Sequence, residues 1–254
     1  MSSDNYSRFA DLYSTGSYPR YSNYIAGKLP DIMGQIGIQP ESILDLACGE
    51  GTFATEAAQL GFEVTGIDVS SEMIEIAREN ADDAGVEVTF IEQDMRSLVL
   101  DETFDLVTSW FDSMNYITDR SDFKKTLENV QSLLGQDGFF VFDMNTIHGL
   151  SVQWQEHDCY VQRDDSSVFE VHRTSYEAEK RIAKLKITFF VKSGNRWEKH
   201  EEVHEERGYE LEEVEKMAAE SGFVVSDIWG EIEGFSSPQD DSGRVWYVLR
   251  NNGS

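Results

Sequence analysis

A run of small residues follows the first predicted strand and has the composition of a ligand-binding turn. The run spans residues 47–51 (ACGEG), directly after the apolar segment Ser42–Leu46. Small residues let the backbone turn tightly and let a ligand lie against it. A pyrophosphate-binding loop needs the spacing G-x-G-x-x-G, at which this chain has Ala47, Gly49 and Thr52. The spacing therefore favours a ligand without a pyrophosphate and disfavours a nicotinamide or nucleotide-sugar enzyme.

Acidic residues stand at the ends of the next two predicted strands. Asp68 ends the strand Glu63–Asp68, and Asp94 comes just after the strand Glu87–Glu92. In an open parallel sheet, ligands bind at the carboxyl ends of the strands. A carboxylate there can accept hydrogen bonds from both hydroxyls of a ribose, and an acid beside Met95 can bind an adenine whose ring packs on the methionine. The structural alternatives are a helix cap for Asp68 and a turn for Asp94.

Short apolar runs alternate with helical patterns over the first 145 residues, which predicts a parallel sheet with crossover helices. The predicted strand Phe104–Ser109 ends in Ser109-Trp110-Phe111, where Trp110 and Phe111 offer an aromatic wall for an adenosine or for the methyl donor. A helix is predicted over Asp119–Leu134, stopped by Gly135, and a buried strand over Phe139–Asp143. Strands at Val224–Trp229 and Val245–Arg250 and a helix at Leu211–Ser221 complete the pattern.

The periodicity changes to two between Asn145 and Gly208, which predicts an antiparallel insert. Apolar residues alternate with mainly polar ones from Ala183 to Val191, and the residues 193–195 (SGN) are typical of a turn. Further strands are predicted at Cys159–Arg163, Val168–Tyr176 and Trp197–His204. The glutamate runs at 201–206 and 210–215 are predicted to be solvated faces.

The composition limits the partners that we expect. The net charge of −27, from 48 acidic and 21 basic residues, repels phosphate backbones and disfavours nucleic acid. Adaptation to high salt explains the same acidity equally well, and then the charge says little about the substrate. Two cysteines are too few for a disulfide framework. Neither a signal peptide nor a membrane-spanning apolar stretch is visible, so a cytoplasmic protein is expected.

Four segments resemble the ordered motifs of class I S-adenosylmethionine-dependent methyltransferases. They are ILDLACGEG (43–51), VTGIDVS (64–70), FIEQDMRSL (90–98) and FDLVTSWFDSMNYI (104–117). Their order and spacing cover about Ser42–Asn145. Ala47 stands where the family more often has glycine, and Glu50 stands where a small or hydroxyl residue is commoner. Alanine is a mild change, and a negative charge at a helix start is tolerated by the helix dipole.

The rest of the chain resembles small-molecule methyltransferases such as the sugar-amine N,N-dimethyltransferases. The segment FADLYSTGSYPRYSNYI (9–25) resembles their tyrosine-rich entry, and residues 201–223 resemble their return from an antiparallel insert. The resemblance implies a lid over the donor that includes Tyr13 and Tyr21, with Arg20 near the donor's carboxylate. The alternative is an amphipathic helix that packs on the sheet edge.

The two resemblances imply S-adenosyl-L-methionine as methyl donor and S-adenosyl-L-homocysteine as product. The fold that they imply is a Rossmann-like, doubly wound, mainly parallel seven-stranded sheet, with the insert between strand five and the following helix. The predicted parts are a lid segment (1–40), the donor-binding domain (41–145 and 209–254) and the insert (146–208). The predicted donor-binding residues are Tyr13, Arg20, Tyr21, Asp45, Ala47, Gly49, Gly51, Asp68, Val69, Asp94, Met95 and Trp110.

Methyl transfer from a sulfonium needs mainly proximity, alignment and a dry site, so no obligatory nucleophile is expected. Tyr116 is predicted to contact the acceptor and to take part in catalysis, and His204 is a candidate base. A surface histidine among glutamates explains His204 equally well. Arg207 is a candidate substrate contact, but on one strand it faces away from His204. The five histidines show no metal-binding spacing with cysteines, so no metal is predicted.

The predicted function is methyl transfer to a small molecule at nitrogen or oxygen. A methyltransferase that acts on RNA or protein is one alternative, and a donor-binding regulatory protein without turnover is another. The acidic residues at the strand ends are compatible with turnover and with binding alone.

Overall fold

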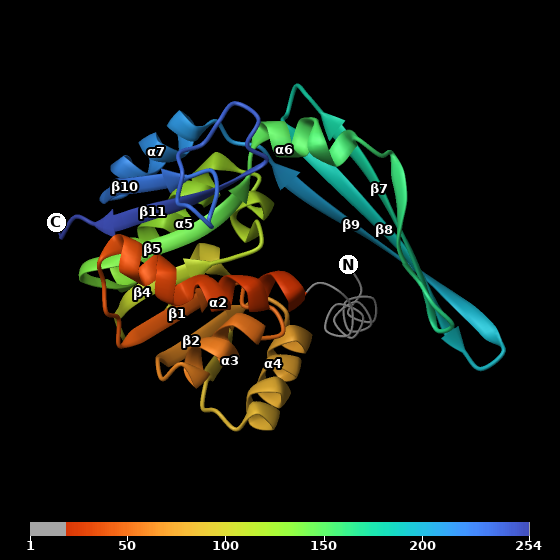
Figure 1. Ribbon diagram of the computed structural model, residues 1–254, viewed down its shortest axis with the longest axis horizontal. Coiled ribbons are helices and arrows are strands. Elements are labelled where there is room, and N and C mark those ends of the chain that lie inside the picture. The colour runs from red at the N-terminus through yellow and green to blue at the C-terminus, as the bar shows by residue number, and fades with distance from the viewer. Residues whose placement is uncertain (1–18, 254) are drawn as a thin grey trace.

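A seven-stranded sheet forms the centre of the part of the chain that the structure describes, residues 19–253 of a computed structural model (Figure 1). Its strands are β1 (Ser42–Leu46), β2 (Glu63–Asp68), β3 (Thr89–Glu92), β4 (Phe104–Ser109), β5 (Leu134–Asn145), β10 (Phe223–Trp229) and β11 (Arg244–Asn251). They lie in the order β10-β11-β5-β4-β1-β2-β3, and β11 runs antiparallel to both of its neighbours. The predicted fold class is confirmed.

Helices cover both faces of this sheet and enclose two apolar cores. One face carries α2 (Pro19–Ile36), α3 (Thr52–Gln59) and α4 (Ser71–Ala84), and the other carries α5 (Arg120–Leu133) and α7 (Leu211–Glu220). Helix α5 shows why these segments are helical. Phe123, Leu127 and Val130 recur at helical spacing and are fully buried, while Asp119 caps the first turn. None of the helices within residues 19–253 has the length and apolarity to cross a membrane.

The direction of the chain reverses between β1 and β4. From β1 the chain proceeds to β2 and β3 on one side, and it then returns to place β4 on the other side of β1. The loops after β1 and β4 therefore diverge and leave a crevice at the carboxyl ends of the strands, which is where open sheets bind ligands.

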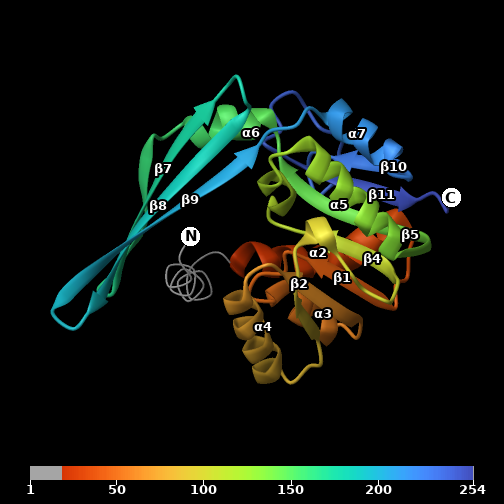
Figure 2. The same ribbon diagram turned by 180° about the vertical axis from the view of Figure 1, so that it is seen from behind.

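The insert forms a second, antiparallel sheet with the order β6-β7-β8-β9. It begins with α6 (Ile147–Ser151) and continues through β6 (Cys159–Asp164), β7 (Val168–Glu177), β8 (Ile182–Ser193) and β9 (Arg196–Arg207). Gly194 has a φ of 61° in the predicted turn. Figures 1 and 2 show that β8 and β9 extend beyond the main sheet as a long twisted ribbon.

Two local predictions are wrong, and two local features were not predicted. Helix α5 ends at Leu133, and β5 begins at once, so Gly135 lies inside the strand segment and does not stop the helix. Residues 135–138 bulge out of the pairing between β4 and β5. No sign of this bulge is visible in the sequence, because the helical pattern continues up to it. The glutamate run on β9 is not wholly solvated, because Glu202 and Glu206 are buried on the face that also carries His204. Short α6 was not predicted.

Candidate active site

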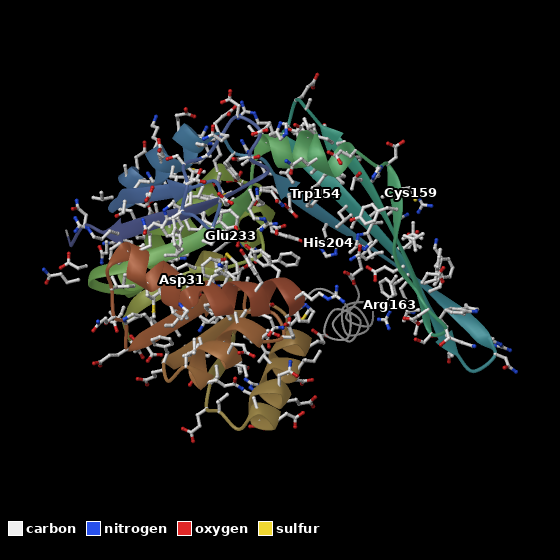
Figure 3. The ribbon with its side chains drawn as sticks, viewed as in Figure 1. Asp31, Trp154, Cys159, Arg163, His204 and Glu233 are labelled. Carbon is white, nitrogen blue, oxygen red and sulfur yellow. The ribbon has the colours of Figure 1, made fainter. Side chains whose placement is uncertain are left out.

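A cavity of about 920 Å³ lies between the carboxyl ends of the central strands and the insert. Its walls come from the loops after β1, β2, β3 and β4 on one side and from the inner face of the second sheet on the other. Figure 3 shows His204 and Trp154 in the space between the two sheets, and both line the cavity. Of the predicted site residues, those that line it are Arg20, Tyr21, Ala47, Gly49, Asp68, Val69, Asp94, Met95, Tyr116 and His204.

Three residues of the loop after β1 have a left-handed backbone conformation, and two of them line the cavity. Ala47, Gly49 and Gly51 have φ angles of 55°, 56° and 78°. A Cβ added at Gly49 would meet nothing within 4 Å, because that position opens toward the cavity. A Cβ at Gly51 would lie 2.8 Å from the Ala77 Cβ and 2.8 Å from the Phe90 ring. Gly51 therefore holds the loop against α4 and β3 and does not line the cavity.

Substitution of Gly51 tests this packing. We expect Gly51→Ala to lower the free energy of unfolding by about 2 kcal/mol or more, because the left-handed backbone and the contacts with Ala77 and Phe90 both oppose a Cβ. Gly49→Ala is the matched control, since its φ is also positive but its Cβ would have space. Urea unfolding measures both. Equal losses for the two variants would show that the packing of Gly51 contributes nothing.

Asp68 joins the end of β2 to the glycine loop. Its carboxylate accepts hydrogen bonds from the Gly49 N–H at 2.9 Å and from the Ser70 N–H at 2.9 Å. Burial raises the pKa of Asp68, and these backbone hydrogen bonds lower it. The helix cap is Ser70 instead, whose Oγ accepts the Met73 N–H at 3.2 Å. The carboxylate thus lies on the cavity wall with its orientation fixed by the backbone.

Asp94 takes the turn position and also lines the cavity, so its contact with an adenine stays a prediction. It caps a short 3-10 turn by accepting the Arg96 N–H at 2.9 Å, and both of its carboxylate oxygens bind the Arg96 guanidinium. This side-chain pairing lowers the pKa of Asp94. Asp94 and Met95 both line the cavity, and Met95 also packs against the apolar core.

Three predicted donor-binding residues lie behind the wall of the main cavity. Gly51 packs as described above. Asp45 is 2 % exposed and accepts the Thr108 hydroxyl at 2.9 Å, and burial raises its pKa to about 8. Trp110 is buried against Phe53, with ring centroids 5.4 Å apart. Asp45 and Trp110 line a smaller pocket of about 40 Å³ behind the loop.

Of the two aromatic residues that follow β4, Phe111 lines the main cavity and Trp110 does not. Phe111 and Asp112 both have positive φ angles, 59° and 53°, so the chain reverses there and turns the next ring toward the cavity. The Phe111 ring stacks on Tyr21 from α2, with centroids 5.2 Å apart. Trp110 lies behind the main cavity and lines only the smaller pocket, so its contact with the donor stays a prediction.

The N-terminal helix serves as packing element and as cavity wall on different faces. Ile25, Leu29 and Ile32 are buried, as the amphipathic alternative requires, whereas Arg20 and Tyr21 line the cavity. Tyr13 lies outside the described residues.

A buried polar network closes the cavity where β5, β11 and β9 meet. Asp143, at 0 % exposure, accepts the Phe111 N–H at 2.7 Å and pairs with Arg244. Arg244 also binds Asp112 at 2.8 Å and lies 5.1 Å from the centroid of the Tyr21 ring. Burial raises the pKa of Asp143.

The insert enters this network through Glu206. The Asn145 side-chain amide donates to Asp112 at 3.0 Å and to Glu206 at 2.8 Å. Burial and the neighbouring Asp112 hold the pKa of Glu206 well above its usual range. Asp112, Glu206 and Arg244 all line the cavity. The network therefore ties the last strand of the insert to the end of β5.

Tyr116 and His204 meet across the cavity, one from the loop after β4 and one from β9. The Tyr116 hydroxyl lies 3.2 Å from His204 Nδ1, and His204 Nε2 lies 3.5 Å from Glu202. Arg207 does not line the cavity. Its guanidinium donates to the Thr118 carbonyl at 2.9 Å and lies over the Tyr209 ring, because an odd separation on β9 turns it away from His204.

Within residues 19–253, no group of three or more histidine, cysteine, aspartate or glutamate side chains is arranged to hold a metal ion.

Comparison with known proteins identifies the chemistry. A family model described as a methyltransferase domain matches residues 43–138. A protein of Geobacillus sp. (strain WCH70), provisionally named a methyltransferase, is 29 % identical over 241 residues, 94 % of this chain and 95 % of its own. A crystal structure of an S-adenosylmethionine-dependent methyltransferase from Clostridium acetobutylicum has a TM-score of 0.83 and 26 % identity, and the match covers 98 % of this chain and 99 % of that one. This chain is an S-adenosylmethionine-dependent methyltransferase.

The fold extends to a more specialised relative. CalS10 from Micromonospora echinaspora, an amino pentose methyltransferase solved with S-adenosylmethionine bound, has a TM-score of 0.69 and 19 % identity, and the match covers 91 % of each chain. At that identity the comparison shows a shared fold alone.

The side chains around the methyltransferase cavity suit the chemistry of its methyl donor. The Asp68 carboxylate offers acceptors for the ribose hydroxyls, and the Met95 side chain offers an apolar surface for the adenine. The positive φ of Gly49 and the open space beside it let a ligand approach the backbone. The residues present therefore fit S-adenosylmethionine.

Several residues of the methyltransferase site were missed in the sequence. Arg244 and Asp112 are separated by more than a hundred positions, and nothing local to either one indicates their pairing. Asp143 did give a signal, because it is an acid that ends a run of buried apolar residues. Glu206 gave one as well, since it shares the strand face of His204 by its even spacing.

Proposed function

We propose that this methyltransferase transfers the methyl group to a nitrogen or oxygen atom of a small molecule that binds between the donor loop and the insert. The observation that carries the proposal is the single cavity that joins Gly49 and Asp68 at the strand ends to His204 on the insert. A cavity walled on both sides by protein suits an acceptor that is small enough to be enclosed. The fold likeness to an amino pentose methyltransferase supports the same choice.

For the donor, we propose the predicted residues that face the main cavity. The Gly49 backbone would lie against the donor, and Asp68 would bind its ribose. Asp94 and Met95 would contact its adenine, and Arg20 would bind its carboxylate. Ala47, Val69 and Tyr21 would complete the wall. Asp45, Gly51 and Trp110 would support the loop from behind.

For the acceptor, we propose that Tyr116 and His204 manage the proton. S-adenosylmethionine supplies an electrophilic methyl group, and the chain must orient the acceptor atom in line with it and exclude water. An acceptor O–H or N–H proton would pass to the Tyr116 oxygen while the tyrosine proton passes to His204 Nδ1. Glu202, near His204 Nε2, would stabilise the resulting imidazolium.

We also propose the division of labour between the parts of the chain. Residues 41–145 and 209–254 would bind the donor, the insert 146–208 would cover the acceptor, and the N-terminal segment 1–40 would close over the donor through residues such as Arg20 and Tyr21. The network around Asn145 and Glu206 supports this division, because it fixes the insert where it leaves the main sheet.

A transfer assay tests the acceptor class. The protein is incubated with methyl-labelled S-adenosylmethionine and, separately, with the small-molecule, protein and RNA fractions of a cell extract. We expect label only in the small-molecule fraction. We expect no label when the amines and hydroxyls of that fraction are chemically blocked before the incubation. Label in protein or RNA would replace the proposed acceptor. Donor binding by calorimetry without transfer to any fraction would indicate a regulatory protein.

A further inference from the structure

A second tyrosine–histidine–glutamate arrangement lies on the other side of the cavity and has no part in the function proposed above. The Tyr160 hydroxyl, on β6, is 3.0 Å from His172 Nδ1, on β7. His172 Nε2 is 2.5 Å from a carboxylate oxygen of Glu170. His172 and Glu170 are 3 % and 5 % exposed, while Tyr160 is 37 % exposed. Two buried polar side chains thus connect to one tyrosine that reaches the cavity.

The hydrogen bonds of His172 set the polarity of the Tyr160 hydroxyl. A carboxylate only accepts, so His172 Nε2 carries the proton that it shares with Glu170. In a neutral imidazole, Nδ1 is then an acceptor, and the Tyr160 hydroxyl must donate to it. The Tyr160 oxygen keeps its lone pairs for a second partner. Burial and the Glu170 charge raise the pKa of Tyr160, so the hydroxyl keeps its proton and does not become a base.

The surroundings show where such a partner would lie. Tyr160 and His172 both line the cavity, and so do Leu185 and Ile187 on the neighbouring strand β8. His204 lies beyond them on β9, opposite Leu185. Strands β7 and β9 are two strand spacings apart, about 10 Å. The inner face of the insert is therefore an apolar floor with a tyrosine–histidine pair on each side.

The burial of Glu170 and His172 argues against a purely structural role. Polar side chains lose hydration when they are buried, and an apolar pair at these positions would avoid that cost. Phe189 and Ile187, the cross-strand neighbours of Glu170 and His172 on the same face, are apolar and buried. The polar pair instead gives the Tyr160 hydroxyl one fixed direction of donation, which is what a recognition site needs.

We propose that Tyr160 binds an N–H or O–H group of the methyl acceptor at a point remote from the atom that is methylated, with His172 and Glu170 as positioning residues. The proposal rests on the proposed function, because it assumes an acceptor enclosed in this cavity. It adds a requirement to the acceptor class: a hydrogen-bond donor on the part of the molecule that faces β6 and β7, away from the reacting atom.

The test compares Tyr160→Phe with the wild type in the transfer assay, with a protein-free cell extract as the acceptor source. The initial rate is measured against the extract concentration. We expect the half-saturating concentration to rise about tenfold, as for loss of one hydrogen bond, and the plateau rate to change less than threefold. Donor affinity, measured by calorimetry, should stay unchanged. Tyr176→Phe is the matched control, since Tyr176 lies on β7 and does not line the cavity.

The outcomes separate this proposal from the one before it. If the wild type labels no small molecule, the proposed function fails and this inference fails with it. If the wild type is active and Tyr160→Phe has the same half-saturating concentration, only the role of Tyr160 is wrong. A fall in plateau rate alone would also overturn it, because that result would give Tyr160 a part in the chemical step.

A second measurement tests the positioning role of His172 without any acceptor. In ¹⁵N-histidine-labelled protein, the signal of His172, assigned from its absence in His172→Gln, should show a proton on Nε2 and none on Nδ1. Tyr160→Phe should shift the Nδ1 resonance. A proton on Nδ1 would reverse the polarity of the Tyr160 hydroxyl and would exclude the proposed donor-type partner.

Discussion

Asp68→Ala should weaken the binding of S-adenosylhomocysteine on the order of 100-fold, as measured by calorimetry. The carboxylate is held at the cavity wall by the N–H groups of Gly49 and Ser70, and its remaining lone pairs can accept both ribose hydroxyls. Each hydrogen bond to a charged acceptor contributes about 1.5 to 3 kcal/mol, and two of them account for the expected factor. Glu63→Ala, at the exposed opposite end of β2, should leave the affinity unchanged.

The change at Asp68 also removes two acceptors of backbone hydrogen bonds, so a loop distortion must be separated from a lost ligand contact. The 2′-deoxy analogue of S-adenosylhomocysteine does this. The wild type should bind this analogue at least tenfold more weakly than it binds the parent compound. The Asp68→Ala variant should bind the analogue and the parent compound about equally. If the analogue loses the same factor in both proteins, Asp68 does not contact that hydroxyl.

The direction in which donor affinity changes with pH provides a further test of the role of Asp68. Burial raises the pKa of this carboxyl in the free protein, and a ligand that hydrogen-bonds to the carboxylate competes with the proton. Affinity should therefore be full above that raised pKa and should fall as the pH is lowered through it. The Asp68→Ala variant should lack this fall.

The donor side of the site was predictable because its determinants are local in the chain. The loop after β1 and the acids Asp68 and Asp94 each follow directly on a strand that the apolar pattern marks. A parallel sheet gathers the carboxyl ends of its strands at one edge, so the order of the strands alone predicts that these residues meet. The position of Phe111, and not Trp110, on the wall of the main cavity has a different cause. Two successive non-glycine residues adopt positive φ angles there, and composition gives no indication of that.

The acceptor side was less predictable because it depends on which face of the insert turns inward. Glu202, His204 and Glu206 are spaced by two residues on one strand and therefore share a face, but the glutamate run predicted a solvated face. The structure buries both glutamates. Asn145, at the end of β5, donates to Glu206, whereas Glu202 lies 3.5 Å from His204 Nε2 on its own strand. Tyr160 and His172 meet through antiparallel pairing of β6 with β7, and no local motif indicates that pairing.

Arg244→Leu should lower the free energy of unfolding by about 2 to 4 kcal/mol. Arg244 is the cation that pairs with Asp143 and Asp112, whose side chains are 0 % and 9 % exposed. Removal of one partner from a buried ion pair leaves an uncompensated charge, which costs about 3 to 5 kcal/mol when no water can reach it. The Arg244 side chain is 22 % exposed and lines the cavity, so water can hydrate the carboxylates partly and the expected loss is smaller. Arg250→Leu, exposed on the same strand, is the matched control.

The loss at Arg244 should depend on pH in a definite direction. Burial already raises the pKa of Asp143, and the Arg244 charge opposes that rise, so Arg244→Leu should raise this pKa further. A carboxyl whose pKa is higher in the folded than in the unfolded state stabilises the fold most below its unfolded pKa, and that contribution is lost as the pH rises through the folded value. The stability gap between Arg244→Leu and the wild type should therefore narrow as the pH falls from 8 toward about 4.

A double variant locates the cause of that gap. Asp143→Asn removes the charge that Arg244 would have paired with. It keeps one oxygen that can accept the Phe111 N–H, but it places an amide NH₂ against the Asp112 N–H, which the wild-type carboxylate accepts at 3.0 Å. Arg244→Leu/Asp143→Asn should recover part of the stability lost in Arg244→Leu, and its remaining deficit should vary less with pH, as measured by urea unfolding across the range. If the deficit of the double variant varies with pH as much as that of Arg244→Leu, the unpaired Asp143 carboxylate is not the source of the pH dependence.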